Sequence, residues 1–236
     1  TDDVVGQIIQ AVDTNGLAEK TIIIFTSDNG CSKAAKIDDL KQKGHHVSGI
    51  YRGSKADLWE GGHRVPFLVR WTNTVKQKSY SNQTICLTDF FATLTDLLLN
   101  DIPPLAAEDS VSFLPALYDQ AIVTERKGII HSSISGHFGY RMNAWKLLLA
   151  RGSGGWTSPK EGAAKQQQLP AYQLYNMTTD PTESNNVGSE HRDIAHKLYT
   201  RLRTDIDAGR STIGTASAND TTAIKLWKSG PPTPEL

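Results

Sequence analysis

The first part of the chain alternates between helical and strand-like hydrophobic spacing. In residues 3–17 apolar side chains recur every three or four positions, which predicts an amphipathic helix that ends at Asn15-Gly16. Residues 21–25, Thr-Ile-Ile-Ile-Phe, form an uninterrupted and mainly β-branched run. Such a run predicts a strand that is buried on both faces of a parallel sheet. A helix that leads into a buried strand favours an α/β fold.

Three further segments complete this part of the pattern. Residues 31–50 are polar and rich in lysine without a clear period, so we expect a loop there. Residues 65–71 predict a second apolar strand. Residues 88–99 place leucine and phenylalanine at helical spacing, which predicts another core-facing helix with Thr88 as its cap.

The pattern changes after about residue 119 to short strand-like pieces separated by Gly- and Ser-rich turns. They lie at residues 128–131, 138–142, 145–150 and 172–175. These four pieces predict a small antiparallel sheet. Residues 191–207 predict a surface helix. The tail from Ser229 predicts an extended terminus. The predicted fold class is α/β, with part of a mixed sheet flanked by helices over residues 1–120. A small antiparallel sheet with a packed helix follows over residues 121–236.

The composition excludes several classes of partner and site. The 236 residues include 25 Lys and Arg and 25 Asp and Glu, so the chain lacks the basic field that carries non-specific nucleic-acid binding, and we expect no nucleic-acid partner. Its longest apolar runs are far below the roughly 20 residues of a membrane helix, so we expect no membrane span. Two cysteines, Cys31 and Cys86, cannot build a multi-bridge framework or a four-thiolate zinc site.

The first motif with chemical potential is Ser27-Asp28-Asn29-Gly30, at the carboxyl end of the first predicted strand. Open α/β sheets bind their ligands at this edge. A carboxylate and an amide oxygen are hard ligands of the kind that Ca²⁺ and Mg²⁺ prefer. Asp-Asn-Gly is also a strong turn sequence, so the tetrapeptide alone favours a turn and leaves a metal site open.

The second motif covers residues 51–67, Tyr-Arg-Gly-Ser-Lys-Ala-Asp-Leu-Trp-Glu-Gly-Gly-His-Arg-Val-Pro-Phe. Lys55 stands among small residues, and its ammonium group suits an anionic ligand. Backbone N–H groups of the glycine turns can add contacts to an anion. The alternative is a solvated loop with incidental charges.

Together these motifs resemble the C-terminal half of the type I sulfatases of the alkaline-phosphatase superfamily. The resemblance runs through Phe25-Thr-Ser-Asp-Asn-Gly, Arg52-Gly-Ser-Lys and Trp59-Glu-Gly-Gly-His-Arg-Val-Pro. Trp145-Lys-Leu and Leu174-Tyr-Asn-Met-Thr-Thr-Asp-Pro-Thr-Glu-Ser-Asn are similar to the late sheet and the C-terminal turn of that family. These motifs, which follow one another in the family's order, imply an alkaline-phosphatase-like sheet.

The resemblance also implies roles for individual residues. Asp28 and Asn29 match a pair of divalent-metal ligands, usually to Ca²⁺ and alternatively to Mg²⁺, and Lys55 matches a lysine that contacts the sulfate oxygens. Arg64 of the Glu-Gly-Gly-x-Arg turn is expected to be mainly structural. His63, at a variable position of that turn, is a candidate for substrate binding. His137 lies on a glycine-flanked turn and either reaches the site or is a surface histidine.

The chain departs from the family at the nucleophile. The family makes formylglycine from the Cys or Ser of a Cys/Ser-x-Pro/Ala-x-Arg motif, and neither Cys31 nor Cys86 stands in one. The resemblance implies that formylglycine, the other metal ligands and the central strands belong to an N-terminal half that is missing from this chain. That half is therefore an expected partner. A periplasmic, secreted or lysosomal location is implied in the same way.

The favoured function is hydrolysis of a sulfate monoester, with a small-molecule or carbohydrate sulfate ester as substrate. One alternative is a non-catalytic metal- or glycan-binding remnant. Another is a phosphoester or phosphonate hydrolase of the same superfamily. Gly154-Gly155-Trp156 offers an aromatic face for a sugar ring, with a packed tryptophan as the alternative.

Overall fold

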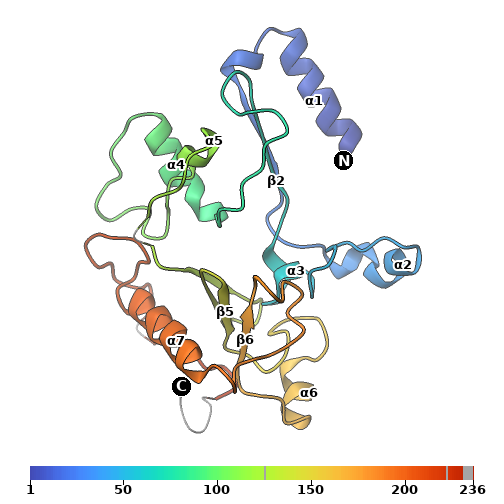
Figure 1. Ribbon diagram of the computed structural model, residues 1–236, viewed down its shortest axis with the longest axis vertical. Coiled ribbons are helices and arrows are strands. Elements are labelled where there is room, and N and C mark those ends of the chain that lie inside the picture. Colours follow the sequence, from blue (N-terminus) through green and yellow to red (C-terminus); the bar gives the residue numbers. More distant parts are fainter. Residues whose placement is uncertain (125, 222, 231–235) are drawn as a thin grey trace. The chain divides into compact units, whose positions relative to one another are not determined.

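The computed structural model describes residues 1–124, 126–221, 223–230 and 236 (Figure 1). They form two compact units, residues 1–27 with 66–124, and residues 28–65 with 125–236. The domain division expected at residue 120 stays a prediction. Most of the predicted extended tail, residues 231–235, lies outside the described residues. Among the described residues, no helix combines the length and the apolar character needed to cross a membrane.

The first unit contains the predicted helix and both predicted strands. Helix α1 spans Asp2–Thr14, the 3-10 turn η1 spans Ala18–Lys20, and strands β1 and β2 span Ile22–Thr26 and Phe67–Trp71. β1 pairs antiparallel with β2, and each of its residues is only partly buried. The expectation of a doubly buried parallel strand is therefore wrong for the described residues. A β-branched run favours a strand, but it does not specify the partner or its direction.

The second helical region of this unit begins with a polar cap. The 3-10 turn η3, Leu87–Asp89, precedes α4, Phe90–Leu97, and α5 follows at Leu114–Leu117. The buried Asp89 carboxylate accepts the backbone N–H of Cys86 at 2.9 Å and of Val111 at 2.9 Å. Cys86 is thus the N-cap of η3, with Asp89 as its capping-box partner, and the expected cap Thr88 lies inside the turn. The helix prediction itself is confirmed.

The second unit starts with short helices where a loop was expected. The 3-10 turn η2 spans Lys33–Ala35, α2 spans Ile37–Gln42, and α3 spans Glu60–His63. The expectation of a plain loop over residues 31–50 is wrong, because Asp38 and Asp39 favour the start of a one-turn helix. Such a short helix leaves no hydrophobic period to detect.

The predicted antiparallel sheet is confirmed. Its strands lie in the order β3-β4-β5-β6, and every neighbouring pair is antiparallel. They span Ile129–Ser132, Phe138–Met142, Trp145–Leu148 and Gln173–Asn176. Helix α6, Glu161–Gln166, lies between β5 and β6, and α7, Arg192–Asp207, follows β6.

The two faces of this sheet bury different partners. Leu147 and Leu174 pack with Leu198 and Leu202 of α7 in one core. Leu148 and Tyr175, at alternate positions on the same strands, pack with Leu58 and Trp59 in a second core. Successive residues of a strand point to opposite faces, so a single sheet both anchors α7 and holds the 58–59 segment.

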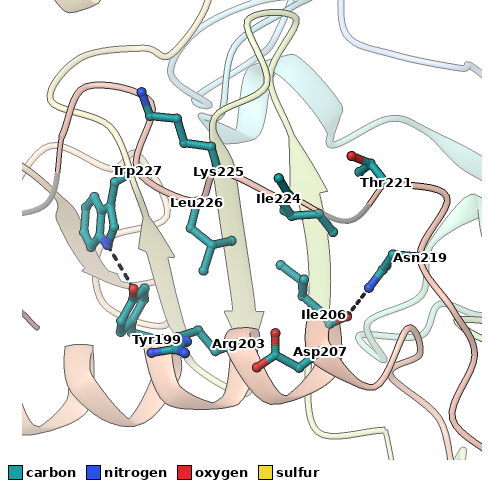
Figure 2. A pocket seen from close by; sticks show the side chains of 11 residues that line it. Tyr199, Arg203, Ile206, Asp207, Asn219, Thr221, Ile224, Lys225, Leu226 and Trp227 are labelled. Carbon is teal, nitrogen blue, oxygen red and sulfur yellow. Dashed lines mark hydrogen bonds between the residues drawn. The ribbon is translucent and has the colours of Figure 1, made fainter.

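A pocket lies between α7 and the C-terminal segment (Figure 2). Its lining combines apolar and charged side chains: Tyr199, Arg203, Ile206, Asp207, Asn219, Thr221 and residues 223–227. Trp227 Nε1 donates to the Tyr199 hydroxyl at 3.0 Å, and Asn219 Nδ2 donates to the Ile206 carbonyl at 2.7 Å. These bonds attach the segment to α7. The candidate residues of the sequence motifs do not line this pocket.

Candidate functional site

The two sequence motifs meet in the second unit through backbone hydrogen bonds. The Gly30 N–H donates to the Gly62 carbonyl at 2.9 Å, and the Lys55 N–H donates to the Cys31 carbonyl at 3.0 Å. The segment with Asp28 and Asn29 therefore adjoins the segment with Lys55. These residues are more than 25 positions apart in sequence, so the fold brings together the ones that the motifs singled out.

Glycine makes this close approach sterically possible. A Cβ on Gly30 would lie 1.8 Å from the Gly61 carbonyl oxygen, and one on Gly61 would lie 2.4 Å from the Gly53 carbonyl oxygen. A Cβ on Gly62 would lie 2.3 Å from the Asp57 carbonyl oxygen. No side chain fits at these three positions without moving backbone. The Asp-Asn-Gly and Glu-Gly-Gly motifs are thus two halves of one packed arrangement.

Asp28 and Asn29 have the donor chemistry of part of a hard-cation site. The Asp28 side chain is exposed, and Asn29 Nδ2 donates to the Gly30 carbonyl at 2.9 Å, which assigns the amide oxygen as the acceptor atom. Carboxylate and amide oxygens fit Ca²⁺ or Mg²⁺. A complete site takes at least about six oxygens. The described residues contain no group of three or more His, Cys, Asp and Glu side chains that could hold a metal ion, so this pair fits the ion only as part of a larger ligand set.

A buried carboxylate, Asp57, fixes the loop that carries Lys55. Asp57 is 3% exposed. Its Oδ2 accepts the Ser54 N–H at 2.8 Å, and its Oδ1 accepts the N–H groups of Trp156 and Thr157 at 2.8 and 3.0 Å. The Asp57 side chain thus ties residues 54–57 to residues 156–157. The partly exposed Lys55 lies within this fixed loop.

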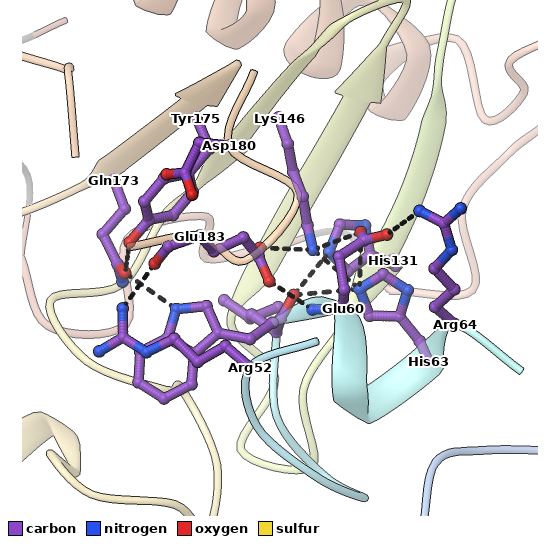
Figure 3. Close-up of polar contacts among 12 residues, drawn as sticks. Arg52, Glu60, His63, Arg64, His131, Lys146, Gln173, Tyr175, Asp180 and Glu183 are labelled. Carbon is purple, nitrogen blue, oxygen red and sulfur yellow. Dashed lines mark hydrogen bonds and ion pairs between the residues drawn. The ribbon is translucent and has the colours of Figure 1, made fainter. Parts of the chain in front are cut away.

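A second polar cluster surrounds Lys146 beside helix α3 (Figure 3). Lys146 is 0% exposed, and its ammonium nitrogen lies 2.8 Å from Glu60 Oε1 and 2.8 Å from Glu183 Oε1. Glu183 Oε2 also accepts the Glu60 N–H at 2.6 Å. Lys146 comes from β5, and Glu183 follows β6. This ion triad therefore attaches the start of α3 to the C-terminal sheet.

Charge and burial shift the carboxyl pKa values of this triad in opposite directions. Burial raises the pKa of Glu60, but the ammonium of Lys146 together with the Arg141 and Arg64 charges outweighs it, and the pKa lies below its ordinary value. Arg64, whose Nη1 lies 3.2 Å from Glu60 Oε2, acts in the same direction. Burial raises the pKa of Glu183 above its ordinary value, although Lys146 opposes the shift. Glu183 is thus the carboxyl group that protonates more readily.

The histidine at the variable position of the turn belongs to the same cluster. His63 Nε2 lies 3.0 Å from Lys146 Nζ, and the His63 and His131 rings lie 4.2 Å apart between centroids. The same Nε2 lies 3.1 Å from the Leu58 carbonyl oxygen, so it accepts from Lys146 in one tautomer and donates to Leu58 in the other. Burial and the Lys146 charge lower the pKa of His63, and burial together with His63 and Lys146 lowers the pKa of His131. Substrate binding by His63 stays a prediction.

His137 is buried rather than placed on a surface turn. It is 4% exposed, its Nδ1 lies 3.1 Å from the Leu149 carbonyl oxygen, and its N–H donates to Ser133 Oγ at 3.2 Å. The expectation of a surface histidine is wrong, because His137 enters the sheet immediately before β4. Its role in substrate binding stays a prediction.

Arg52 and Arg64 brace the motif against its surroundings. Arg52 Nη1 donates to the Glu183 carbonyl at 2.8 Å, and its guanidinium lies 3.7 Å from the Trp59 ring centroid. Arg64 lies 4.4 Å from the Tyr51 ring centroid in addition to its ion pair with Glu60. Trp59 Nε1 donates to Gln173 Oε1 at 3.0 Å, which extends the network to β6. These contacts are consistent with the expected structural role of Arg64.

Sequence reasoning did not single out Asp57, Glu60, Lys146 and Glu183 as a connected set. One signal was available for Lys146, which occupies an inward-facing position of the predicted strand 145–150, where a charge requires a partner. The identity of that partner depends on the tertiary fold. Glu60 and Glu183 are separated by 123 positions in sequence.

Comparison with known proteins places these features in a family. Residues 1–100 match the family model described as Sulfatase. The N-acetylgalactosamine-6-O-sulfatase of Bacteroides thetaiotaomicron is 33% identical over 214 residues, which are 85% of this chain and 39% of that protein. The steryl-sulfatase of Mus musculus is 33% identical over 222 residues, which are 84% of this chain and 35% of that protein. The chain thus spans about two fifths of the length of these curated relatives.

Solved structures with a similar fold also point to sulfatases. A structure described under the metabolism of multiple glycosaminoglycans by Bacteroides thetaiotaomicron superposes with a TM-score of 0.71 at 29% identity, over 86% of this chain and 42% of that chain. A structure in complex with D-glucosamine-2-N,6-O-disulfate superposes with a TM-score of 0.62 at 22% identity, over 87% of this chain and 38% of that chain, and shows likeness of fold alone. The chain belongs to the sulfatase family and corresponds to the C-terminal portion of a type I sulfatase.

Proposed function

We propose that this chain forms part of a sulfuric ester hydrolase that converts a sulfate monoester and water into an alcohol and sulfate. The observation that carries the proposal is the contact between the two motif segments, through the Gly30–Gly62 and Lys55–Cys31 hydrogen bonds. It places two hard oxygen ligands and one primary ammonium on adjoining backbone. A cation and an ammonium group are the charges that stabilise a sulfuryl group as negative charge develops on its oxygens.

Asp28 and Asn29 are proposed to hold a divalent cation, Ca²⁺ or Mg²⁺. The ion would supply charge neutralisation at the sulfuryl oxygens. Asp28 contributes a full charge and Asn29 a neutral oxygen, and the hydrogen bond from Asn29 Nδ2 to Gly30 orients the amide. The remaining ligands would come from water, substrate or other parts of the longer protein.

Lys55 is proposed to contact the sulfuryl oxygens directly. Its backbone is held by Cys31 on one side, and the neighbouring Asp57 is bonded to three N–H groups. A fixed backbone reduces the reorganisation that is needed when charge develops on the substrate. Lys55 would therefore act by electrostatic stabilisation of the sulfuryl oxygens.

The formylglycine nucleophile does not fit any position of this chain. The sequence contains no Cys/Ser-x-Pro/Ala-x-Arg motif. We therefore propose that an N-terminal half of the same protein supplies the nucleophile and the other ligands. Exposed apolar side chains of the first unit, among them Val4, Ile8, Leu68 and Leu94, support such a partner, as does a sheet of only two strands. We also propose a location in the periplasm, a lysosome or the extracellular space, which the family resemblance supports.

The experiment compares full-length wild-type protein with its Lys55→Ala variant on sulfate and phosphate monoesters of one alcohol. We expect hydrolysis of the sulfate ester to dominate, and Lys55→Ala to lower kcat/KM by roughly 10²-fold, the scale of one lost charge-stabilising donor. Lys55→Arg, which keeps the charge, serves as the matched control and should retain more activity. Preference for the phosphate ester would indicate a phosphoester hydrolase. Wild-type protein that binds a cation but cleaves neither ester would indicate a non-catalytic remnant.

A further inference from the structure

Residues 153–157 form a loop whose backbone is fixed against the Lys55 segment. The Asp57 carboxylate accepts the N–H groups of Trp156 and Thr157, and Ser54 Oγ lies 3.2 Å from Thr157 Oγ1. The Leu58 N–H donates to the Ser153 carbonyl at 2.8 Å. Hydrogen bonds from 54, 57 and 58 thus hold the loop along its length.

The two glycines of this loop allow direct backbone contact. A Cβ on Gly155 would lie 2.2 Å from the Ala56 carbonyl oxygen, so residues 155 and 56 touch without an intervening side chain. Gly154 has a φ of +67°, and a Cβ there would lie 3.0 Å from Leu58 Cδ1. Glycine is needed at 154 for its conformation and at 155 for its size. The position of Trp156 relative to residues 54–58 is therefore set by the backbone.

The Trp156 side chain is nevertheless left in solvent. It is 38% exposed, whereas Trp59 and Trp227 of the same unit are buried. An exposed indole on a mobile loop would need no explanation, but this loop has its N–H groups bonded to a buried carboxylate. A rigid backbone that presents a large apolar ring to water is the arrangement of a preorganised binding surface.

The charges next to this indole suit an anionic ligand. Lys33, in the turn that follows the Asp28-Asn29 motif, donates its ammonium to the Trp156 carbonyl at 2.5 Å. Lys55 lies two residues before Asp57, which holds the Trp156 N–H. Asp57 is the acidic group here, and its oxygens are occupied by three backbone N–H groups. The loop therefore joins one apolar ring to a segment with two ammonium groups.

We infer that Trp156 is the ring platform of the substrate site, on which the apolar face of a sulfated ring stacks while its sulfate lies toward Lys55. The substrate class is then a sulfate ester carried on a ring, either the pyranose ring of a sugar or an arene, rather than an acyclic alkyl sulfate. This inference rests on the proposed function for the role of Lys55. It extends the proposed function because it names Trp156 as the residue that selects the ring of the substrate.

The test measures equilibrium binding, so it is independent of turnover. Three sulfonates, whose C–S bonds a sulfatase does not hydrolyse, are titrated calorimetrically into full-length protein: 6-deoxy-6-sulfoglucose, benzenesulfonate and methanesulfonate. The variants are Trp156→Ala, Trp156→Phe and, as a matched control for the loss of an exposed aromatic side chain, Tyr80→Ala from the first unit. Circular dichroism checks that each variant is folded.

We expect Trp156→Ala to weaken binding of at least one ring ligand roughly tenfold, the upper range for an aromatic contact. Trp156→Phe should retain most of the affinity, and methanesulfonate should bind all variants alike. The ring ligand that loses more affinity identifies sugar or arene as the natural ring. Unchanged affinity for both rings, or an equal loss for methanesulfonate, would overturn the platform, as would a wild-type protein that binds neither ring.

These outcomes separate this inference from the proposed function. Sulfate ester hydrolysis with ring binding that is insensitive to Trp156 would leave the proposed function intact and refute the platform. Ring binding that depends on Trp156 in a protein without sulfatase activity would refute the proposed function and leave the ring platform intact.

Discussion

Replacement of Lys146 by methionine tests whether the buried triad holds α3 against the C-terminal sheet. Methionine keeps most of the side-chain volume but removes the ammonium that lies 2.8 Å from both Glu60 and Glu183. Two carboxylates then remain in a region where Lys146 and Glu183 are both 0% exposed. Breaking a buried ion pair by removing one partner costs about 3–5 kcal/mol of unfolding free energy, because the other charge is left without compensation. We expect a loss of that size at pH 7.

The loss should shrink as the pH falls. Burial already raises the pKa of Glu183, and removal of the Lys146 charge raises it further. A group whose pKa is higher in the folded than in the unfolded protein favours folding as the pH drops through the folded value. In the wild type, Glu60 has a lowered pKa, so its contribution to stability is lost only as the pH falls below the ordinary value of 4.5, and the change between pH 7 and pH 5 reports on Glu183. Both effects bring variant and wild type closer together under acidic conditions.

The measurement is urea unfolding of full-length protein at pH 7 and pH 5. Hydrogen exchange of the peptides that contain residues 58–63 and 145–148 reports on the two elements that the triad connects. The double variant Lys146→Met with Glu183→Gln is the matched control and should recover much of the loss, because Arg64 still pairs with Glu60. A Lys146→Met protein as stable as the wild type at pH 7, or equally destabilised at both pH values, would refute this reasoning.

Four further predictions address the rest of the site and the core. Asp28→Ala should reduce bound Ca²⁺ or Mg²⁺ in the purified full-length protein, measured by elemental analysis, and unchanged metal content would contradict the ligand assignment. Gly30→Ala, whose Cβ would lie 1.8 Å from the Gly61 oxygen, should separate the two motif segments and lower the unfolding free energy by about 1–3 kcal/mol in urea titrations. An unchanged unfolding free energy would mean that the contact between the segments does not contribute to stability. Burial lowers the pKa of His131 below its ordinary value of 6.5, so the unfolded chain takes up a proton at a higher pH than the folded protein does. The unfolding free energy should therefore fall as the pH drops below 6.5. A His131→Gln protein whose unfolding free energy shows the same pH dependence as the wild type would argue against this assignment. Leu202→Ala, at a fully buried position against the sheet, should lower the unfolding free energy by about 2–5 kcal/mol. A change near zero, as expected for an exposed side chain, would show that α7 does not close this core.

Much of the second unit followed from local pattern. Short strand-like pieces separated by Gly- and Ser-rich turns marked the strands that became β3–β6, since neighbouring antiparallel strands need only short connections. The four-residue spacing of apolar side chains marked α7, whose Leu198 and Leu202 face the sheet. The motif residues Asp28, Asn29 and Lys55 were identified by resemblance, and their segments do adjoin. Their roles stay predictions.

The errors share one cause, which is that direction and pairing across the chain are not encoded locally. The β-branched run at β1 indicates a strand with equal strength whether its partner is parallel or, as observed, antiparallel. His137 looks exposed because glycines flank it, yet the turn folds inward onto Leu149. Lys146 is the reverse case, since its strand position predicts burial, but no sequence rule finds Glu60 and Glu183 as its partners.

The C-terminal sheet supports the motif loops at two separate points, and this has a consequence for how the site works. Lys146 on β5 and Glu183 after β6 hold α3 at Glu60, while the loop after β5 holds the Lys55 segment through Asp57. Residues 28–65 are therefore positioned by the side chains of Lys146 and Glu183 and by backbone N–H groups of the loop after β5, beyond the glycine contacts within the motifs themselves. A change in the 153–157 loop would then alter ligand selection at Trp156 without touching Asp28 or Asn29, and a change at Lys146 would shift α3 without removing a ligand-contacting group. Such a division lets one part of the fold keep the charge-stabilising residues fixed while a neighbouring loop varies the ring that is bound.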